Sequence, residues 1–144
     1  MSNIENNVLQ IQVLYPKIYF ACHQQHSKAK SAKGQLTDRD LNILVHIFDG
    51  KYRYNKELAN HLNVAPSTMS EALNHLVALK VLLTKIDDND QRRTRYLLTD
   101  AGRTALQESS VLDSNKLTKM LNKLNAEQQT QVLQGLQLLA DAGN

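Results

Sequence analysis

Hydroxyl, amide and carboxylate side chains follow Pro66 at a spacing that could bring them to DNA. A proline can open a helix without the loss of a backbone hydrogen bond, so we expect a helix to begin near Pro66. Small hydroxyl groups on its first turns could donate to phosphate, helped by the helix dipole. Amide and carboxylate groups farther along could pair with adenine and cytosine. The candidate contacts are Ser67, Thr68, Ser70, Glu71, Asn74 and His75.

A second group of candidate contacts lies in the polar segment DDNDQRRTR, residues 87–95. It holds the arginines Arg92, Arg93 and Arg95 beside the carboxylates of Asp87, Asp88 and Asp90. One carboxylate could orient an arginine while another arginine enters a minor groove. We favour Arg92 for the groove, with a simple surface ion pair as the alternative. Alternate strand residues share a face, so Arg93 and Arg95 could both contact phosphate only.

The stretch ELANHLNVAPSTMSEALNHL, residues 57–76, predicts a helix-turn-helix that would present the first group. Two helices that cross tightly need a small residue at the crossing, and Ala59 supplies it. The turn needs a residue that tolerates a positive φ, and Asn63 does so more readily than most. The apolar residues expected on the shared buried face are Leu58, Leu62, Val64, Met69 and Ala72.

The second group would be carried by a hairpin. The runs VLLTKI (81–86) and TRYLL (94–98) are rich in residues that favour strands, and the polar segment between them predicts a solvent-exposed turn. The residues YRY at 52–54 predict a very short strand. A strand, a helix-turn-helix and a basic hairpin in this order predict a winged helix.

Capping signals predict the surrounding helices. Thr37 followed by Asp40 is a variant capping box for a helix that ends near Gly50. Asn55 can cap the next helix. Thr99 can cap a long helical region that reaches residue 124, with uncertain continuity at 113–115.

The two ends of the chain carry apolar stripes. Residues 4–26 have a helical stripe that Pro16 interrupts, and Pro16 either opens this helix or kinks it. The cationic segment 27–35 predicts a mobile loop. Asn125 begins a final helix, and the leucines from 117 to 139 predict the core of a dimer.

Composition restricts the class of protein. The 144 residues favour one domain, and the net charge of +3 permits nucleic acid as a partner. From Lys51 to Arg103 there are nine Lys or Arg against six Asp or Glu, so the positive charge lies in the middle. Signal-peptide and membrane-span patterns are absent, which predicts a soluble cytoplasmic protein. We expect no enzyme and no cofactor, because neither a phosphate-binding glycine loop nor a recognisable nucleophile occurs.

Cys22 is the single cysteine, and three roles are open to it. His23 and His26 could lower its pKa and make it an oxidant sensor. Cys22 and His26 also have the spacing of a helical metal pair, although two ligands are too few for a site. We favour a small apolar side chain in the dimer interface, because free cysteines are usually buried.

Aromatic residues on the same helix suggest an effector cleft. Tyr15, Tyr19 and His23 are the candidates for its lining. Packing is at least as good an explanation for the two tyrosines.

The chain resembles the MarR family of bacterial transcriptional regulators from about Leu14 onward. The resemblance rests on LTDRDLNIL, on ELANHLNVAPSTMSEALNHL and on DNDQRRTRYLLTDAG. The positions that match the family's wing motif are Asp90, Arg92, Leu98, Thr99 and Gly102. The resemblance implies a homodimer whose first and last two helices interlock, with two recognition helices in successive major grooves. Related proteins often release DNA when a small phenolic or anionic ligand binds between the dimer and DNA lobes.

These observations predict a mainly α protein with a small β wing, a single MarR-like domain over residues 1–144. Residues 1–35 and 104–144 would form the dimer, and residues 36–103 the DNA-binding lobe. The expected function is that of a dimeric regulator, a repressor released by an effector. A winged-helix module that binds another protein is the rival, since Glu71 and Gln91 lower the positive charge. Gating by oxidation or metal at Cys22 is a further alternative.

Overall fold

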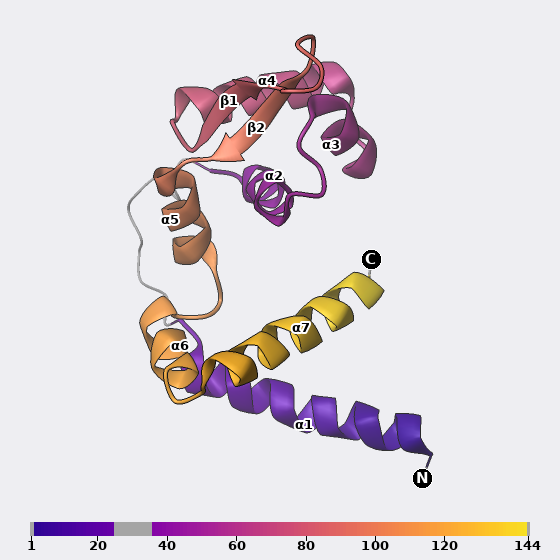
Figure 1. The fold of residues 1–144 in the computed structure, drawn as a ribbon, viewed down its shortest axis with the longest axis vertical. Helices are drawn as coiled ribbons and strands as arrows, with labels where there is room; N and C mark the ends of the chain where they lie inside the picture. Colours follow the sequence, from indigo (N-terminus) through magenta and orange to yellow (C-terminus); the bar gives the residue numbers. More distant parts are fainter. Residues whose placement is uncertain (1, 25–35, 144) are drawn as a thin grey trace. The chain divides into compact units, whose positions relative to one another are not determined.

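The computed structural model describes residues 2–24 and 36–143, which form two compact units (Figure 1). One unit comprises residues 27–110, and the other combines residues 1–26 with 111–144. The predicted loop at 27–35 and His26 lie outside the described residues.

The unit of residues 27–110 is a winged helix, in which the predicted helix-turn-helix is followed by the predicted hairpin. Three helices precede a two-stranded antiparallel sheet, and a fourth helix follows it. The elements are α2 (Asp38–Asp49), α3 (Asn55–His61), α4 (Pro66–Ala78), β1 (Leu82–Ile86), β2 (Thr94–Leu98) and α5 (Asp100–Ser109). The fold class is therefore mainly α with a small β wing.

Local signals place the boundaries of α2 and α4. Thr37 and Asp40 form the predicted capping box, since each side chain accepts a hydrogen bond from the other residue's backbone N–H. Gly50 ends α2 with φ of 79°, and Pro66 is the first residue of α4. Asn63 adopts φ of 54°, as expected for the turn of the helix-turn-helix.

Two local predictions around α3 are wrong. Asn55 does not cap α3: Tyr54 precedes the helix, and Asn55 is its first residue, with a side chain that points to α4. Residues 52–54 form no strand, although the N–H of Tyr96 on β2 donates to the carbonyl of Arg53 at 3.2 Å. One hydrogen bond at this edge is too few for a third strand, because a ladder needs successive pairs.

The core of this unit forms where α2, α3 and α4 meet the start of β1. Its fully buried side chains include Ile43, Leu44, Leu58, Met69, Leu73, Leu76, Val81 and Leu82. Ala59 is buried at the crossing of α3 and α4, as predicted, whereas Leu62 and Val64 are half-buried beside the core. The core therefore fixes the face of α4 that is left for solvent.

Gly102 on α5 allows a close approach to the backbone of Val81. A Cβ at this position would lie 2.3 Å from the carbonyl oxygen of Val81, a distance that no real Cβ shows. The same carbonyl accepts from the N–H of Thr99 at 3.1 Å. Only glycine therefore lets α5 reach the start of the hairpin.

The second unit contains α1 (Asn3–Cys22), α6 (Ser114–Leu121) and α7 (Ala126–Ala142). The long helix predicted after Thr99 is interrupted, because residues 110–113 leave the helical conformation and Asp113 caps a new helix, α6. The predicted start of α7 at Asn125 is confirmed by a capping box with Gln128.

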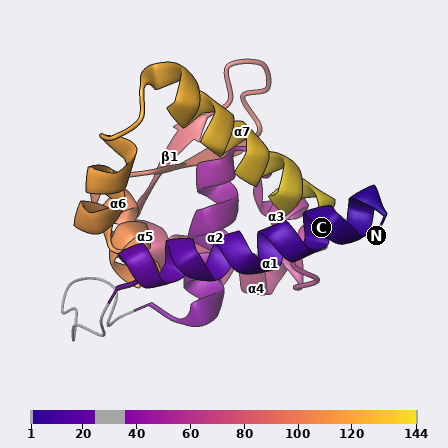
Figure 2. The same ribbon diagram turned by 90° about the horizontal axis from the view of Figure 1, so that it is seen from below.

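Pro16 lies within α1, which runs as one ribbon in both views (Figures 1 and 2). The alternative in which Pro16 opens the helix is therefore excluded. Backbone hydrogen bonds join the end of α1 to the segment before α6, from Asp113 N to Cys22 O at 2.7 Å and from Gln24 N to Val111 O at 2.8 Å. Among the described residues, no helix has both the length and the apolar character that crossing a bilayer requires.

Candidate nucleic-acid interface

One face of α4 carries the polar residues predicted to reach DNA. Met69, Ala72, Leu73 and Leu76 are buried in the core. Because helical neighbours three and four residues apart share a face, the opposite side is left with a separate set. Its exposed members are Ser67, Glu71, Asn74 and His75.

The start of α4 combines free backbone amides with a hydroxyl side chain. The residue before the helix, Ala65, provides no side-chain hydrogen bond to the first turn. Ser67 is exposed there, whereas Thr68 is half-buried. A helix start without its own cap can satisfy its N–H groups with an anion, and a DNA phosphate is one.

Ser70 is tied to the other helix of the helix-turn-helix. Its Oγ accepts a hydrogen bond from Nδ2 of Asn55, and both residues are half-buried. Ser70 can still donate its own hydroxyl hydrogen to a phosphate oxygen. Its first role in the structure, however, is to hold α3 against α4.

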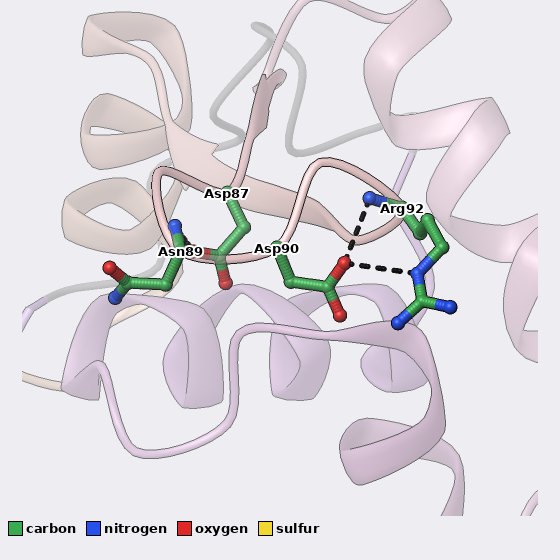
Figure 3. A network of polar contacts seen from close by, with 4 residues as sticks. All are labelled: Asp87, Asn89, Asp90 and Arg92. Carbon is green, nitrogen blue, oxygen red and sulfur yellow. Dashed lines mark hydrogen bonds and ion pairs between the residues drawn. The ribbon is translucent and has the colours of Figure 1, made fainter.

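The wing presents Arg92 at the turn between β1 and β2. The Arg92 side chain is 92% exposed. Figure 3 shows Asp90 next to it, with one carboxylate oxygen that accepts from the backbone N at 3.0 Å and from Nε at 3.3 Å. Nε is engaged by Asp90, so the two terminal nitrogens remain available to an acceptor outside the chain.

Arg93 is occupied within the protein. Its Nη2 lies 3.0 Å from Oε1 of Glu57 on α3, and its guanidinium lies 3.5 Å from the centre of the Tyr54 ring. A guanidinium over a tyrosine ring is attracted by the ring's negative face. Contact with phosphate would therefore compete with these two partners.

Arg95 faces different surroundings. Arg95 lies opposite Lys85 in the antiparallel register of the sheet and is half-buried. Its Nε is buried without a hydrogen-bond partner in the described part of the chain. The three arginines thus differ in availability, and Arg92 is the most exposed of them.

The turn of the wing is not uniformly exposed, contrary to the sequence prediction. Asp87 is 7% exposed, and its carboxylate is satisfied by hydrogen bonds from the hydroxyl of Tyr54 and the N–H of Asn89. These hydrogen bonds, with that from Tyr54 the stronger cause, lower the pKa of Asp87, and the same bond to Asp87 raises the pKa of Tyr54.

Sequence reasoning missed Tyr54, Asn55 and Glu57 as residues of this interface. Their partners lie 33, 15 and 36 residues away, so no local spacing could reveal the contacts. The only sequence feature that could have pointed to these three residues is that they are polar and lie close to the predicted helix-turn-helix.

Two of the candidates for an effector cleft, Tyr15 and Tyr19, lie on α1, and the third, His23, directly follows the helix. Tyr19 stacks on His23 with ring centres 5.2 Å apart, and Phe20 meets Tyr19 edge-on at 5.6 Å. Tyr15 is 64% exposed. Tyr19 and His23 thus lie together and are half-buried, whereas Tyr15 is exposed.

Cys22 is fully buried at the end of α1, and its thiol donates to the carbonyl of Ile18 at 3.1 Å. A buried thiol of this kind is a small apolar side chain with little access for an oxidant. Residues 2–24 and 36–143 contain no group of three or more His, Cys, Asp or Glu placed to hold a metal ion.

Comparisons with known proteins agree with this geometry. Residues 36–102 match the family described as winged helix DNA-binding domain, which covers the recognition helix and the wing. A search of curated proteins finds no match.

Solved structures resemble the chain over nearly its whole length. The transcriptional regulator Tm0710 of Thermotoga maritima is 20% identical with a TM-score of 0.53, and the match covers 96% of this chain and 92% of that one. A MepR mutant of S. aureus, bound to an oligodeoxyribonucleotide, is 15% identical with a TM-score of 0.52. A ZitR mutant of Lactococcus lactis is 19% identical with a TM-score of 0.51. The last two matches cover 100% of both chains. At these identities the likeness concerns the fold.

Proposed function

We propose that this chain, which carries a winged helix DNA-binding domain within a MarR-like fold, is a homodimeric transcriptional regulator that represses nearby genes. It would act in the cytoplasm on double-stranded operator DNA. The observation that carries the proposal is the exposed polar face of α4 in the same compact unit as the exposed Arg92 of the wing.

The polar side chains of α4 and the arginines of the wing have distinct roles in this proposal. Ser67 and Thr68 bind phosphate together with the backbone N–H groups at the start of α4. Asn74 pairs with adenine, and Glu71 accepts from the amino group of cytosine. Arg92 enters the adjacent minor groove. Arg93, which forms an ion pair with Glu57, stabilises the wing and makes no major contact with DNA.

The unit that contains α1 and α7 supports the dimer. Both helices expose large apolar side chains that a soluble monomer rarely leaves in one patch. On α7 these are Val132, Leu133, Leu136, Leu138 and Leu139, and on α1 they include Ile4, Val8, Leu9, Leu14 and Phe20. A second copy of the chain would bury both faces and place two recognition helices on one DNA duplex.

Release by a small phenolic or anionic effector completes the proposal. The stacked Tyr19 and His23 offer an aromatic surface and a titratable imidazole at the end of the dimer-forming helix α1. Cys22 has no part in release, because its thiol is buried.

Fluorescence anisotropy with a labelled duplex, selected by the protein from random sequence, tests DNA binding. We expect sequence-specific binding that weakens steeply with salt. Arg92→Ala should weaken it about 10-fold and reduce the salt slope by about 1. Arg39→Ala, which removes the same charge from α2, should leave the affinity nearly unchanged. The absence of a sequence-specific complex at low salt would refute the proposal and favour a protein partner.

A further inference from the structure

The wing is fastened to α3 by side chains that are distant in the sequence. Tyr54, directly before α3, donates its hydroxyl hydrogen to Oδ2 of Asp87, directly after β1. Arg93 covers the ring of Tyr54 and pairs with Glu57, the third residue of α3. We call Tyr54, Glu57, Asp87 and Arg93 the wing clamp.

The clamp also closes the turn of the wing from within. The backbone N–H of Asp87 donates to the carbonyl of Arg93 at 3.0 Å. Figure 3 shows the carboxylate of Asp87 beside Asn89, whose N–H donates to it at 2.8 Å. The N–H of Arg93 donates to the carbonyl of Asp90 at 3.0 Å. Asp87 therefore links α3, the first part of the turn and the start of the returning strand.

Arg92 is positioned by the residues on either side of it in the turn, Asp90 and Arg93, and not by contacts of its own with α3. Its backbone lies between Asp90, which binds it, and Arg93, which the clamp holds. Its side chain is otherwise in solvent. The place of the Arg92 guanidinium thus depends on where the clamp sets the turn.

We propose that Tyr54 and Asp87 are positioning residues for DNA binding, which hold the wing against α3 so that Arg92 meets the minor groove. This inference rests on the proposed DNA-binding function. An isolated two-stranded hairpin is only marginally stable, so an unclamped wing would have to become ordered as DNA binds. The conformational entropy lost at that moment would weaken the complex. The clamp orders the wing in advance.

Tyr54→Phe tests the proposal, because it removes the hydroxyl and keeps the ring under Arg93. We expect the Kd for the selected duplex to rise about 3- to 10-fold, the range of one hydrogen bond. Tyr52→Phe is the matched control, since the ring of Tyr52 stacks on His61 at the end of α3 and not on a residue of the wing clamp. It should bind as the wild type does.

A double-mutant cycle with Arg92→Ala separates positioning from a general loss of stability. If Tyr54 acts through Arg92, the double variant binds no more weakly than Arg92→Ala alone. If the fold increases in Kd of the two single variants multiply in the double variant, the proposal is overturned. It is also overturned if Tyr54→Phe leaves the Kd unchanged while the wild type binds.

Amide hydrogen exchange tests the clamp without DNA, and so separates its failure from that of the proposed function. Tyr54→Phe should speed exchange at Asp87, Asn89 and Arg93, whose N–H groups close the turn, and Tyr52→Phe should not. Unchanged exchange in Tyr54→Phe overturns the clamp. A wild type with an ordered wing and no affinity for any duplex overturns DNA binding instead.

Discussion

The side chain of Asn55, the first residue of α3, donates a hydrogen bond to the hydroxyl of Ser70 on α4. The bond joins the two helices of the helix-turn-helix at a half-buried point beside the candidate DNA surface. It adds a directed contact to the apolar packing of Ala59, Met69 and Leu73. The angle at which α4 is presented therefore depends on a polar pair as well as on the core.

Removal of this bond should destabilise the winged helix. Asn55→Ala is expected to lower the free energy of unfolding by about 0.5–1.5 kcal/mol, because Ser70 loses its donor. Urea unfolding followed by circular dichroism measures the change. Asn60→Ala, at an exposed position of the same helix, is the control and should be neutral or slightly stabilising. Equal stability of the two variants would show that the Asn55 bond contributes nothing.

Two glycines should respond in opposite directions to alanine. Gly102→Ala places a Cβ against the carbonyl of Val81 and should cost about 1–3 kcal/mol or more, because the backbone of Val81 cannot move aside as a flexible side chain could. Gly135→Ala in α7 meets nothing within 4 Å and should stabilise by about 0.5–1 kcal/mol, the helix preference for alanine. Thermal unfolding should show a lower Tm for Gly102→Ala and a higher Tm for Gly135→Ala than for the wild type. A stable Gly102→Ala protein would contradict the close approach of α5 to the hairpin.

The stability contributed by Asp87 should depend on pH. The bonds from Tyr54 and Asn89 hold the pKa of Asp87 below its ordinary value of 3.8, so the folded protein binds this proton less readily than the unfolded chain. The contribution is complete above that ordinary value and is lost as the pH falls through the lowered pKa. Asp87→Asn removes the titration.

Urea unfolding at neutral pH and at about pH 3 checks this prediction. The difference in the free energy of unfolding between the wild type and Asp87→Asn should be larger at neutral pH. Asp88→Asn in the same turn is the control, because Asp88 is exposed. A difference that stays constant or grows in acid would contradict the assigned hydrogen bonds.

A charge on the apolar face of α7 should break the proposed dimer. Leu136 is 55% exposed within one chain, and Leu136→Asp would bury an unpaired carboxylate in the interface. Sedimentation velocity should then show a monomer with greatly weakened DNA binding. Gln134→Asp adds the same charge to the same helix and should remain a dimer. A dimeric Leu136→Asp protein would place the interface elsewhere.

Much of the fold followed from signals that act over a few residues. The capping box at Thr37, the helix starts at Pro66 and Asn125 and the positive φ of Asn63 were all predicted correctly. Helix and turn preferences depend on hydrogen bonds and backbone sterics within one turn, so neighbouring residues carry the information. The polar face of α4 followed in the same way from helical periodicity.

The pairing of distant residues could not be obtained from such signals. Three arginines within four residues look alike in the sequence, yet only folding places Glu57 and Tyr54 against Arg93 and leaves Arg92 in solvent. In the same way, one of three neighbouring aspartates becomes buried because Tyr54 reaches it from 33 residues away. The availability of a charged group depends on which side chains surround it in space, and chain order alone does not specify those neighbours.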